Sequence, residues 1–251
     1  MQAFWYTLIW NIVIGLWILF TLYLAKRILD KLVNKLNFVI AFTVGLLLWI
    51  IFLGFVPKVA DNLPWMQVGS WILVGLFLFY ILELFLHWHH CKDLNHKECS
   101  HKHHLENHKS GFLMFGGTLL HNAFHWIVLF GAFSVSTTFW IATTLAILLH
   151  SIPQNVVNFV MNKHQEKFAY LAAIGGILGA ILTYPFKDFL LANKFYILAL
   201  IAGGLLYTSL ADIFPEVKEK WNTTYKFINL LIIFAGIGVF VVIEYLSKLV
   251  K

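Results

Sequence analysis

Long uninterrupted runs of apolar residues dominate the pattern of this chain. A helix needs roughly 20 apolar residues to cross the hydrocarbon core of a bilayer. Eight candidate stretches are Phe4–Ala25, Phe38–Val56, Val68–Leu86, Gly111–Phe133, Thr137–Met161, Ala169–Phe186, Phe195–Phe214 and Phe227–Leu246. Within them, polar and apolar residues do not alternate, which excludes the strands of a membrane β-barrel. The pattern predicts an all-α, polytopic bundle of eight membrane-spanning helices, in one domain that covers residues 1–251.

Composition supports the membrane class. Hydrophobic residues make up 60% of the chain and charged residues 12%, with a mean hydropathy of +0.79. A soluble domain could not bury that much apolar surface. We expect no cleavable signal peptide, because Lys26 and Arg27 follow the first apolar run and no basic region precedes it.

The positions of the basic residues predict the orientation. The first, third, fifth and seventh loops hold 4, 4, 2 and 3 of the 18 Lys and Arg, and the termini and even loops hold the other five. Positive residues gather on the cytosolic side, so the odd loops are expected in the cytosol and both termini outside. The net charge of +6 then reflects loops that face anionic lipid. We therefore expect no nucleic-acid partner, and we expect the plasma (inner) membrane as the location.

The loop between the third and fourth stretches, residues 87–109, is rich in histidine. It holds eight of the twelve histidines and both cysteines. Its candidate ligands are His87, His89, His90, Cys91, His96, Cys99, His101, His103, His104 and His108. Histidine at this density favours weak, fluxional metal binding, and reduced cytosolic thiols would add soft ligands. The alternative is a solvated loop whose histidines only carry charge.

Polar side chains also lie deep within the fourth and fifth stretches. His121 and His125, with Asn122 beside them, are spaced i, i+4 and share one face of a helix. In the next stretch, His150 starts a second polar face. Its further members at i+4 and i+8 are Gln154 and Asn158, with Ser151 and Asn155 beside them. Imidazoles and amides in hydrocarbon are costly, so they normally face a bundle interior and have a function there.

These two polar faces are expected to meet. The short turn Ser134–Ser136 makes the two helices antiparallel neighbours and places His121 and His150 at similar depth. Three imidazoles and an amide oxygen can then converge, and that ligand set suits Zn²⁺. The alternative is that each histidine is an isolated buried group that is hydrogen-bonded to a neighbouring helix.

Three motifs in this order resemble the ZIP (Zrt/Irt-like) family of zinc and iron transporters. The first is His121-Asn122-Ala123-Phe124-His125-Trp126. The second is His150-Ser151-Ile152-Pro153-Gln154-Asn155, followed by Asn158-Phe159. The third is Ala202-Gly203-Gly204-Leu205-Leu206-Tyr207, followed by Asp212-Ile213-Phe214-Pro215-Glu216. The resemblance covers essentially the whole chain, and eight spans with a His-rich third loop also fit the family.

The resemblance implies transport of a divalent metal ion, with zinc as the expected substrate, into the cytosol. Fe²⁺ and other divalent ions stay open, and no organic cofactor is expected. Carried over by position, the primary site comprises His121, His125, His150 and Gln154. The secondary or pore residues are Asn122, Ser151, Asn155, Asn158 and Asp212. A homodimer is an open alternative to a monomer.

The chain departs from the family where the family usually has carboxylates. At those positions this chain has His125, Ser151 and Asn155. In addition, the sixth stretch, Ala169–Phe186, contains neither a carboxylate nor a histidine. We therefore expect a single, electrically neutral site and no two-metal site. A divalent ion keeps its full charge at such a site, because no carboxylate neutralises it. The free-energy cost of removing the ion from water is then poorly offset.

The sequence leaves two other classes of protein to consider. A membrane di-iron enzyme is disfavoured, because His121 and His125 lie mid-membrane and the loop doublets have the wrong spacing. The stronger rival is a ZIP-like membrane protein that binds or senses metal without transporting it. Glu83, near the end of the third stretch, is expected to reach the membrane interface.

Overall fold

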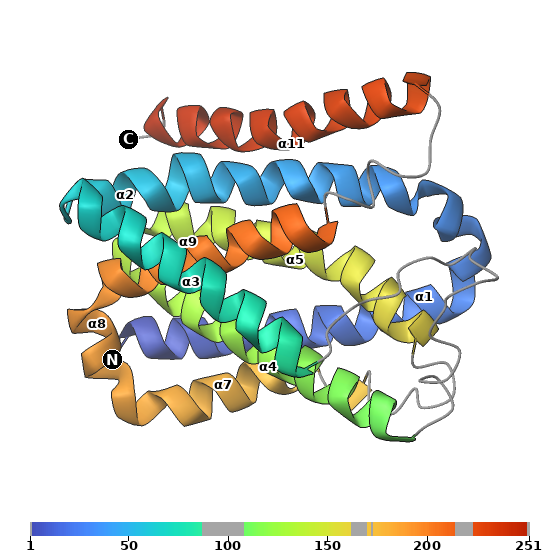
Figure 1. Cartoon of the computed structure of the whole chain (residues 1–251), viewed down its shortest axis with the longest axis horizontal. Coiled ribbons are helices and arrows are strands. Elements are labelled where there is room, and N and C mark those ends of the chain that lie inside the picture. The colour runs from blue at the N-terminus through green and yellow to red at the C-terminus, as the bar shows by residue number, and fades with distance from the viewer. Residues whose placement is uncertain (1, 87–107, 162–169, 172, 214–222, 250–251) are drawn as a thin grey trace.

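The structure, a computed structural model, describes residues 2–86, 108–161, 170–171, 173–213 and 223–249, and these residues form an all-helical bundle (Figure 1). The elements are α1 (Gln2–Trp49), η1 (Ile50–Phe55), α2 (Val56–Ala60), α3 (Trp65–Leu86), α4 (His108–Val135), α5 (Thr137–Met161), α7 (Gly175–Thr183), η2 (Tyr184–Phe186), α8 (Lys187–Ala192), α9 (Lys194–Tyr207), η3 (Thr208–Ile213) and α11 (Thr223–Leu249). The segments η1 and η3 are π-helices.

Five helical segments in the described part of the chain are long and apolar enough to cross a membrane. They are Trp5–Leu24, Phe38–Ala60, Trp65–Leu84, Gly116–Val135 and Lys194–Ala211. Two shorter apolar segments, Phe139–Ile152 and Tyr225–Val239, lie in the fifth and eighth predicted stretches. The chain is therefore an integral membrane protein that is helical in its described part.

The first two predicted stretches belong to one helix. α1 is helical from Gln2 to Trp49, including the polar segment that the sequence analysis treated as a loop. Its ribbon turns back at the right of Figure 1, so the two apolar parts of α1 run in opposite directions. Helical geometry at Lys26–Asn37 was not expected, because the prediction followed hydrophobicity alone, whereas no glycine or proline in this segment interrupts a helix.

The sixth predicted stretch is not one continuous helix. Ala173 and Ile174 form a turn, and α7 begins only at Gly175. After nine residues it passes into the short η2 and α8 segments, with Pro185 at the start of η2. Apolar composition alone did not show these breaks.

Close contacts between backbones hold α7 against α4. A Cβ atom at Gly179 would lie 2.6 Å from the carbonyl oxygen of Ala123, and one at Gly175 would lie 2.5 Å from that of Leu119. Only glycine permits this approach, which is how small residues pack membrane helices. The contact fixes α7 beside the half of α4 that carries the histidines.

Ser136 makes the tight turn between α4 and α5. It is the only residue between the two helices, and its hydroxyl accepts a hydrogen bond from the Phe139 backbone N–H at 3.2 Å. This is an N-cap interaction that satisfies a free donor at the start of α5. Lys194 also donates to the Ser134 carbonyl oxygen at 3.2 Å, which ties the end of α4 to the start of α9. The predicted antiparallel pair is confirmed.

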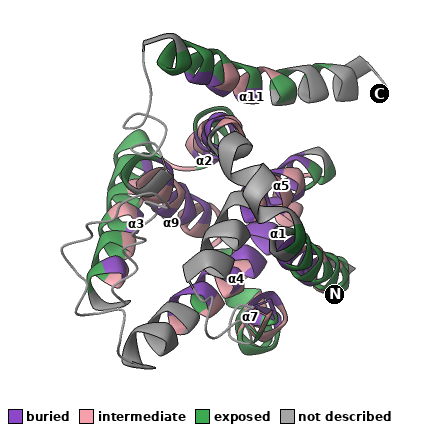
Figure 2. Cartoon of the chain, turned by 90° about the vertical axis from the view of Figure 1, so that its right-hand side faces the viewer, coloured by how far each residue is buried: buried purple, intermediate pink, exposed green. Residues whose placement is uncertain are grey.

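The core lies between α1, α4, α5 and α9. In Figure 2 the buried positions of α4 and α5 face the middle of the bundle, whereas α3 and α11 carry exposed residues on their outer sides. Large apolar side chains on those outer sides, such as Phe77 and Phe234, are more than half exposed at 57% and 59%. Such surfaces fit a hydrocarbon environment.

Candidate metal centre

Three histidines converge inside the bundle. His121 and His125 come from successive turns of α4, and His150 comes from α5. All three are buried, with exposed fractions of 8%, 6% and 7%. One ligand nitrogen from each ring lies within 4.8 Å of the other two. The convergence expected from the i, i+4 spacing and the short turn is therefore present, and none of the three rings faces lipid.

The two α4 histidines already have the spacing of metal ligands. Their Nε2 atoms lie 3.1 Å apart, a hydrogen bond in which one ring donates and the other accepts. Two nitrogens bound to Zn²⁺ at about 2.0–2.1 Å in tetrahedral geometry would lie about 3.3 Å apart. The His150 ring is further off, with its centroid 5.5 Å from that of His121 and 6.4 Å from that of His125. The two α4 rings lie closer together, with centroids 4.7 Å apart, and all three histidines keep a ligand nitrogen within 4.8 Å of the others.

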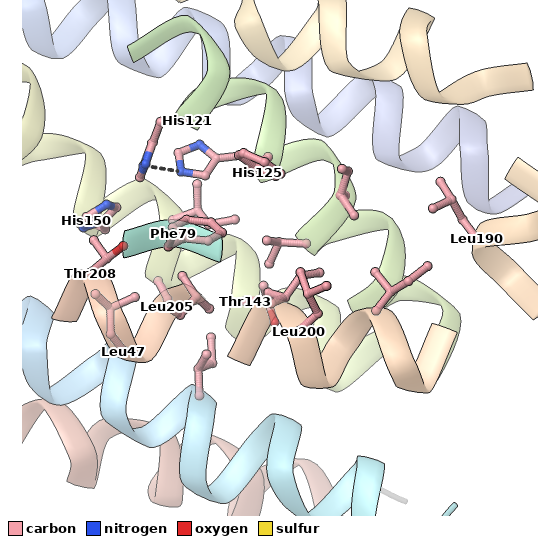
Figure 3. Close-up of a pocket in the computed structure, with 18 of the residues that line it drawn as sticks. Leu47, Phe79, His121, His125, Thr143, His150, Leu190, Leu200, Leu205 and Thr208 are labelled. Atoms are coloured by element: carbon pink, nitrogen blue, oxygen red, sulfur yellow. Dashed lines mark hydrogen bonds between the residues drawn. The ribbon is translucent and has the colours of Figure 1, made fainter. Parts of the chain in front are cut away.

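A cavity of about 240 Å³ adjoins the three rings. Figure 3 shows His121, His125 and His150 at one end of it and Leu190 at the other. The described wall comprises the three histidines, Thr143, Thr208 and otherwise apolar side chains. No carboxylate is among the described lining residues, so the described side chains around an ion here are neutral.

A hydrogen bond from α1 holds α5 close to His150. The Trp17 indole N–H donates to the carbonyl oxygen of Leu148 at 2.9 Å, and the Ser151 hydroxyl donates to the same oxygen at 2.8 Å. Leu148 precedes His150 by two residues, so the Trp17 contact restrains the backbone that carries the ligand. Nothing in the local sequence pattern distinguishes Trp17 from a lipid-facing tryptophan, so the sequence does not predict this contact.

Two predicted secondary residues lie outside the cavity wall. Asn122 packs against α7, where a Cβ atom at Gly175 would lie 2.8 Å from the Asn122 Cβ. Ser151 is fully buried and its hydroxyl bonds to its own helix. Neither is among the described residues that line the cavity. A role for either side chain at the proposed site stays a prediction.

The other predicted site residues have no described side chains. Gln154, Asn155 and Asn158 lie within α5, and Asp212 lies within η3. In the His-rich loop, residues 87–107 lie outside the described residues, and His108 is the first residue of α4. A contribution from any of these groups stays a prediction.

Glu83 differs from its expected place at the membrane interface. Its side chain is buried, at 8% exposed, and the Tyr207 hydroxyl donates a hydrogen bond to its Oε2. This hydrogen bond joins α3 to α9. Glu83 lies one helical turn after Phe79, and Tyr207 directly precedes Thr208; Phe79 and Thr208 both line the cavity. A carboxylate near a helix end can reach water only if its face is free, and here the neighbouring helix α9 covers it.

The chain is similar to several curated zinc transporters. Zinc transporter ZIP13 of Pongo abelii is 29% identical over 185 residues, which cover 70% of this chain and 52% of that protein. Zinc transporter ZIP13 of Danio rerio is 31% identical over 139 residues, or 52% of this chain and 40% of that protein. An uncharacterized zinc transporter of Schizosaccharomyces pombe is 31% identical over 116 residues, or 39% of this chain and 26% of that protein.

These similarities support the resemblance to the ZIP family of metal transporters that the sequence motifs indicated. It spans about half the length of the curated relatives that it matches first, with 40% and 52% of two ZIP13 proteins covered. No model of a known protein family matches it. The similarity agrees with the motif resemblance on α4, α5 and α9, and the relatives are named as transporters.

Proposed function

We propose that this protein transports a divalent metal ion, with zinc as the cargo, across the membrane and into the cytosol. The observation that carries the proposal is the convergence of three buried imidazoles from two neighbouring membrane helices. Neutral imidazole is a strong ligand for zinc, and buried polar clusters in membrane bundles mark ion pathways. The names of the relatives support zinc over Fe²⁺ and other divalent ions.

The proposed ligands are His121, His125, His150 and Gln154. The first two are preformed, with Nε2 atoms 3.1 Å apart, and His150 lies within reach. Gln154 follows His150 by one helical turn on the same face of α5, so its amide oxygen is the proposed fourth donor. The pore residues Asn155, Asn158 and Asp212 are proposed to contact the ion before or after this site.

Eight membrane crossings with both termini outside complete the proposed architecture. The support is that all eight predicted stretches overlap helical segments, together with the excess of Lys and Arg in the odd loops. The His-rich loop is then cytosolic and gathers ions that leave the pore. We propose the plasma (inner) membrane as the location. Cysteine labelling from either side of sealed vesicles tests the topology.

Uptake of radiolabelled zinc into proteoliposomes tests the transport proposal. The parent should accumulate zinc, and a variant with His121, His125 and His150 all changed to Ala should not. Deletion of Cys91–Asn107 should change the rate but leave specific uptake. If the parent and the triple variant take up zinc equally, the three histidines do not carry the ion and the proposal fails.

One observation favours a second candidate, a ZIP-like protein that binds or senses metal without moving it. The described cavity wall holds no carboxylate to offset the charge of a divalent ion during passage. Zinc binding at the three histidines without uptake would support this candidate.

We also propose the lipid bilayer as a partner and a homodimer as the assembly. Mass measurement in lipid nanodiscs tests the homodimer.

A further inference from the structure

The cavity beside the histidines is too large and too apolar to serve a metal ion alone. Its volume is about 240 Å³. A cavity of about 150 Å³ with apolar walls stays dry and accommodates benzene. Ordered water needs two to four polar partners, and away from the histidines the described wall offers only the hydroxyls of Thr143 and Thr208. Each of these hydroxyl groups donates to a carbonyl oxygen of its own helix, so only its acceptor lone pairs can bind a water molecule. A hydrated ion would therefore find few hydrogen bonds here.

The wall has aromatic surfaces next to the imidazoles. The rings of Phe79 and Phe124 lie 5.3 Å apart between centroids, at an interplanar angle of 42°, and both line the cavity. Phe79 is fixed against α9, because a Cβ atom at Gly204 would lie 2.4 Å from its ring. Aromatic rings pack favourably on one another in offset or edge-on arrangements. This part of the wall therefore suits a flat aromatic body.

The charge of the site determines the other end of such a molecule. An ion on three neutral imidazoles retains a charge of +2 within the described apolar surroundings. The Born cost of burial rises with the square of the charge, so one anionic donor would reduce it to about a quarter. Three imidazoles leave two positions open on a five-coordinate ion, and a two-donor head would take these two positions in place of Gln154.

We propose that this cavity binds a flat aromatic molecule of about ten non-hydrogen atoms with a monoanionic, two-donor chelating head. The head ligates an ion held by His121, His125 and His150, and the aromatic body lies along Phe79 and Phe124. The inference rests on the proposed metal site and extends it to a class of organic ligand.

Binding of 8-hydroxyquinoline to the full-length protein in lipid nanodiscs tests the inference. The probe is titrated by fluorescence with and without zinc, and zinc alone is titrated in parallel. Protein-free nanodiscs give the background from partition into lipid. Leu200→Trp fills the cavity from α9, and Val128→Phe fills it from α4. Leu182→Trp is the matched control, because Leu182 is 70% exposed on α7.

In the presence of zinc, the probe should bind the parent and Leu182→Trp alike and each filled variant at least tenfold more weakly. Zinc alone should bind the parent and the filled variants within about twofold. Phe79→Leu keeps the wall apolar but removes an aromatic ring. It should weaken the binding of the probe more than it weakens the binding of zinc.

Equal probe affinity in the parent and both filled variants would overturn the inference, even if zinc binds normally. A cavity that a lipid acyl chain occupies would give this same result. Failure of the parent to bind zinc would instead refute the proposed metal site. The two failures are therefore distinguishable.

Discussion

The loss of zinc affinity when a single histidine is replaced should be largest for the histidines that are already placed to bind the ion. Four-ligand structural zinc sites bind with about 10–16 kcal/mol in total, so one ligand contributes roughly 3 kcal/mol, or about a hundredfold in affinity. His121 and His125 form a pair with Nε2 atoms 3.1 Å apart. The His150 ring lies further away, with its centroid 5.5 Å from that of His121 and 6.4 Å from that of His125, against 4.7 Å between the two α4 rings. We expect His121→Ala to weaken zinc binding about a hundredfold and His150→Ala about tenfold to thirtyfold.

Calorimetry on the full-length protein in detergent measures these affinities. The isotherm of a variant that lacks all three histidines gives the background from the His-rich loop and is subtracted. Thr144→Val is the matched control. Thr144 is buried on α5, and its hydroxyl donates to the backbone carbonyl oxygen of Trp140. It is not among the described residues that line the cavity. Thermal unfolding of each metal-free variant shows whether it is folded.

Two results would refute this reasoning. Zinc binding by His121→Ala or His150→Ala that equals the parent's would show that these residues are not ligands. A larger loss for His150→Ala than for His121→Ala would show that the close α4 pair is only a hydrogen bond between buried rings and not a preformed chelate.

Three further predictions follow from particular contacts. His125→Glu should bind zinc about tenfold more tightly than the parent, because a carboxylate beside the ion offsets its charge; equal or weaker binding in calorimetry would contradict the neutral-site argument. Trp17→Phe removes the hydrogen bond to Leu148, worth about 1 kcal/mol, and should weaken zinc binding about threefold to tenfold, whereas Trp10→Phe, whose ring packs on Trp140, should not. Gly179→Ala should lower the unfolding temperature, because its Cβ would lie 2.6 Å from the Ala123 carbonyl oxygen, whereas Gly238→Ala, with nothing within 4 Å, should leave it unchanged.

The local pattern of the sequence determined the helices and the convergence of the three histidines. Apolar runs of membrane length predict helices, because only internally hydrogen-bonded backbone is stable in lipid. The i, i+4 spacing of His121 and His125 places both on one face. The single-residue turn at Ser136 then brings α5 back beside α4. These are short-range properties, so the sequence alone predicted that His150 would meet the α4 pair.

The tertiary structure decided what the polar residues around the three histidines pack against. Asn122 lies next to His121 in the chain but packs against α7, because the glycines of α7 approach α4 on that face. Glu83 is buried through its contact with Tyr207, 124 residues away. Trp17 acts on α5 through a contact across 131 residues. Such contacts depend on how distant helices pack, and helical periodicity within one segment carries no information about the neighbour that will cover each face.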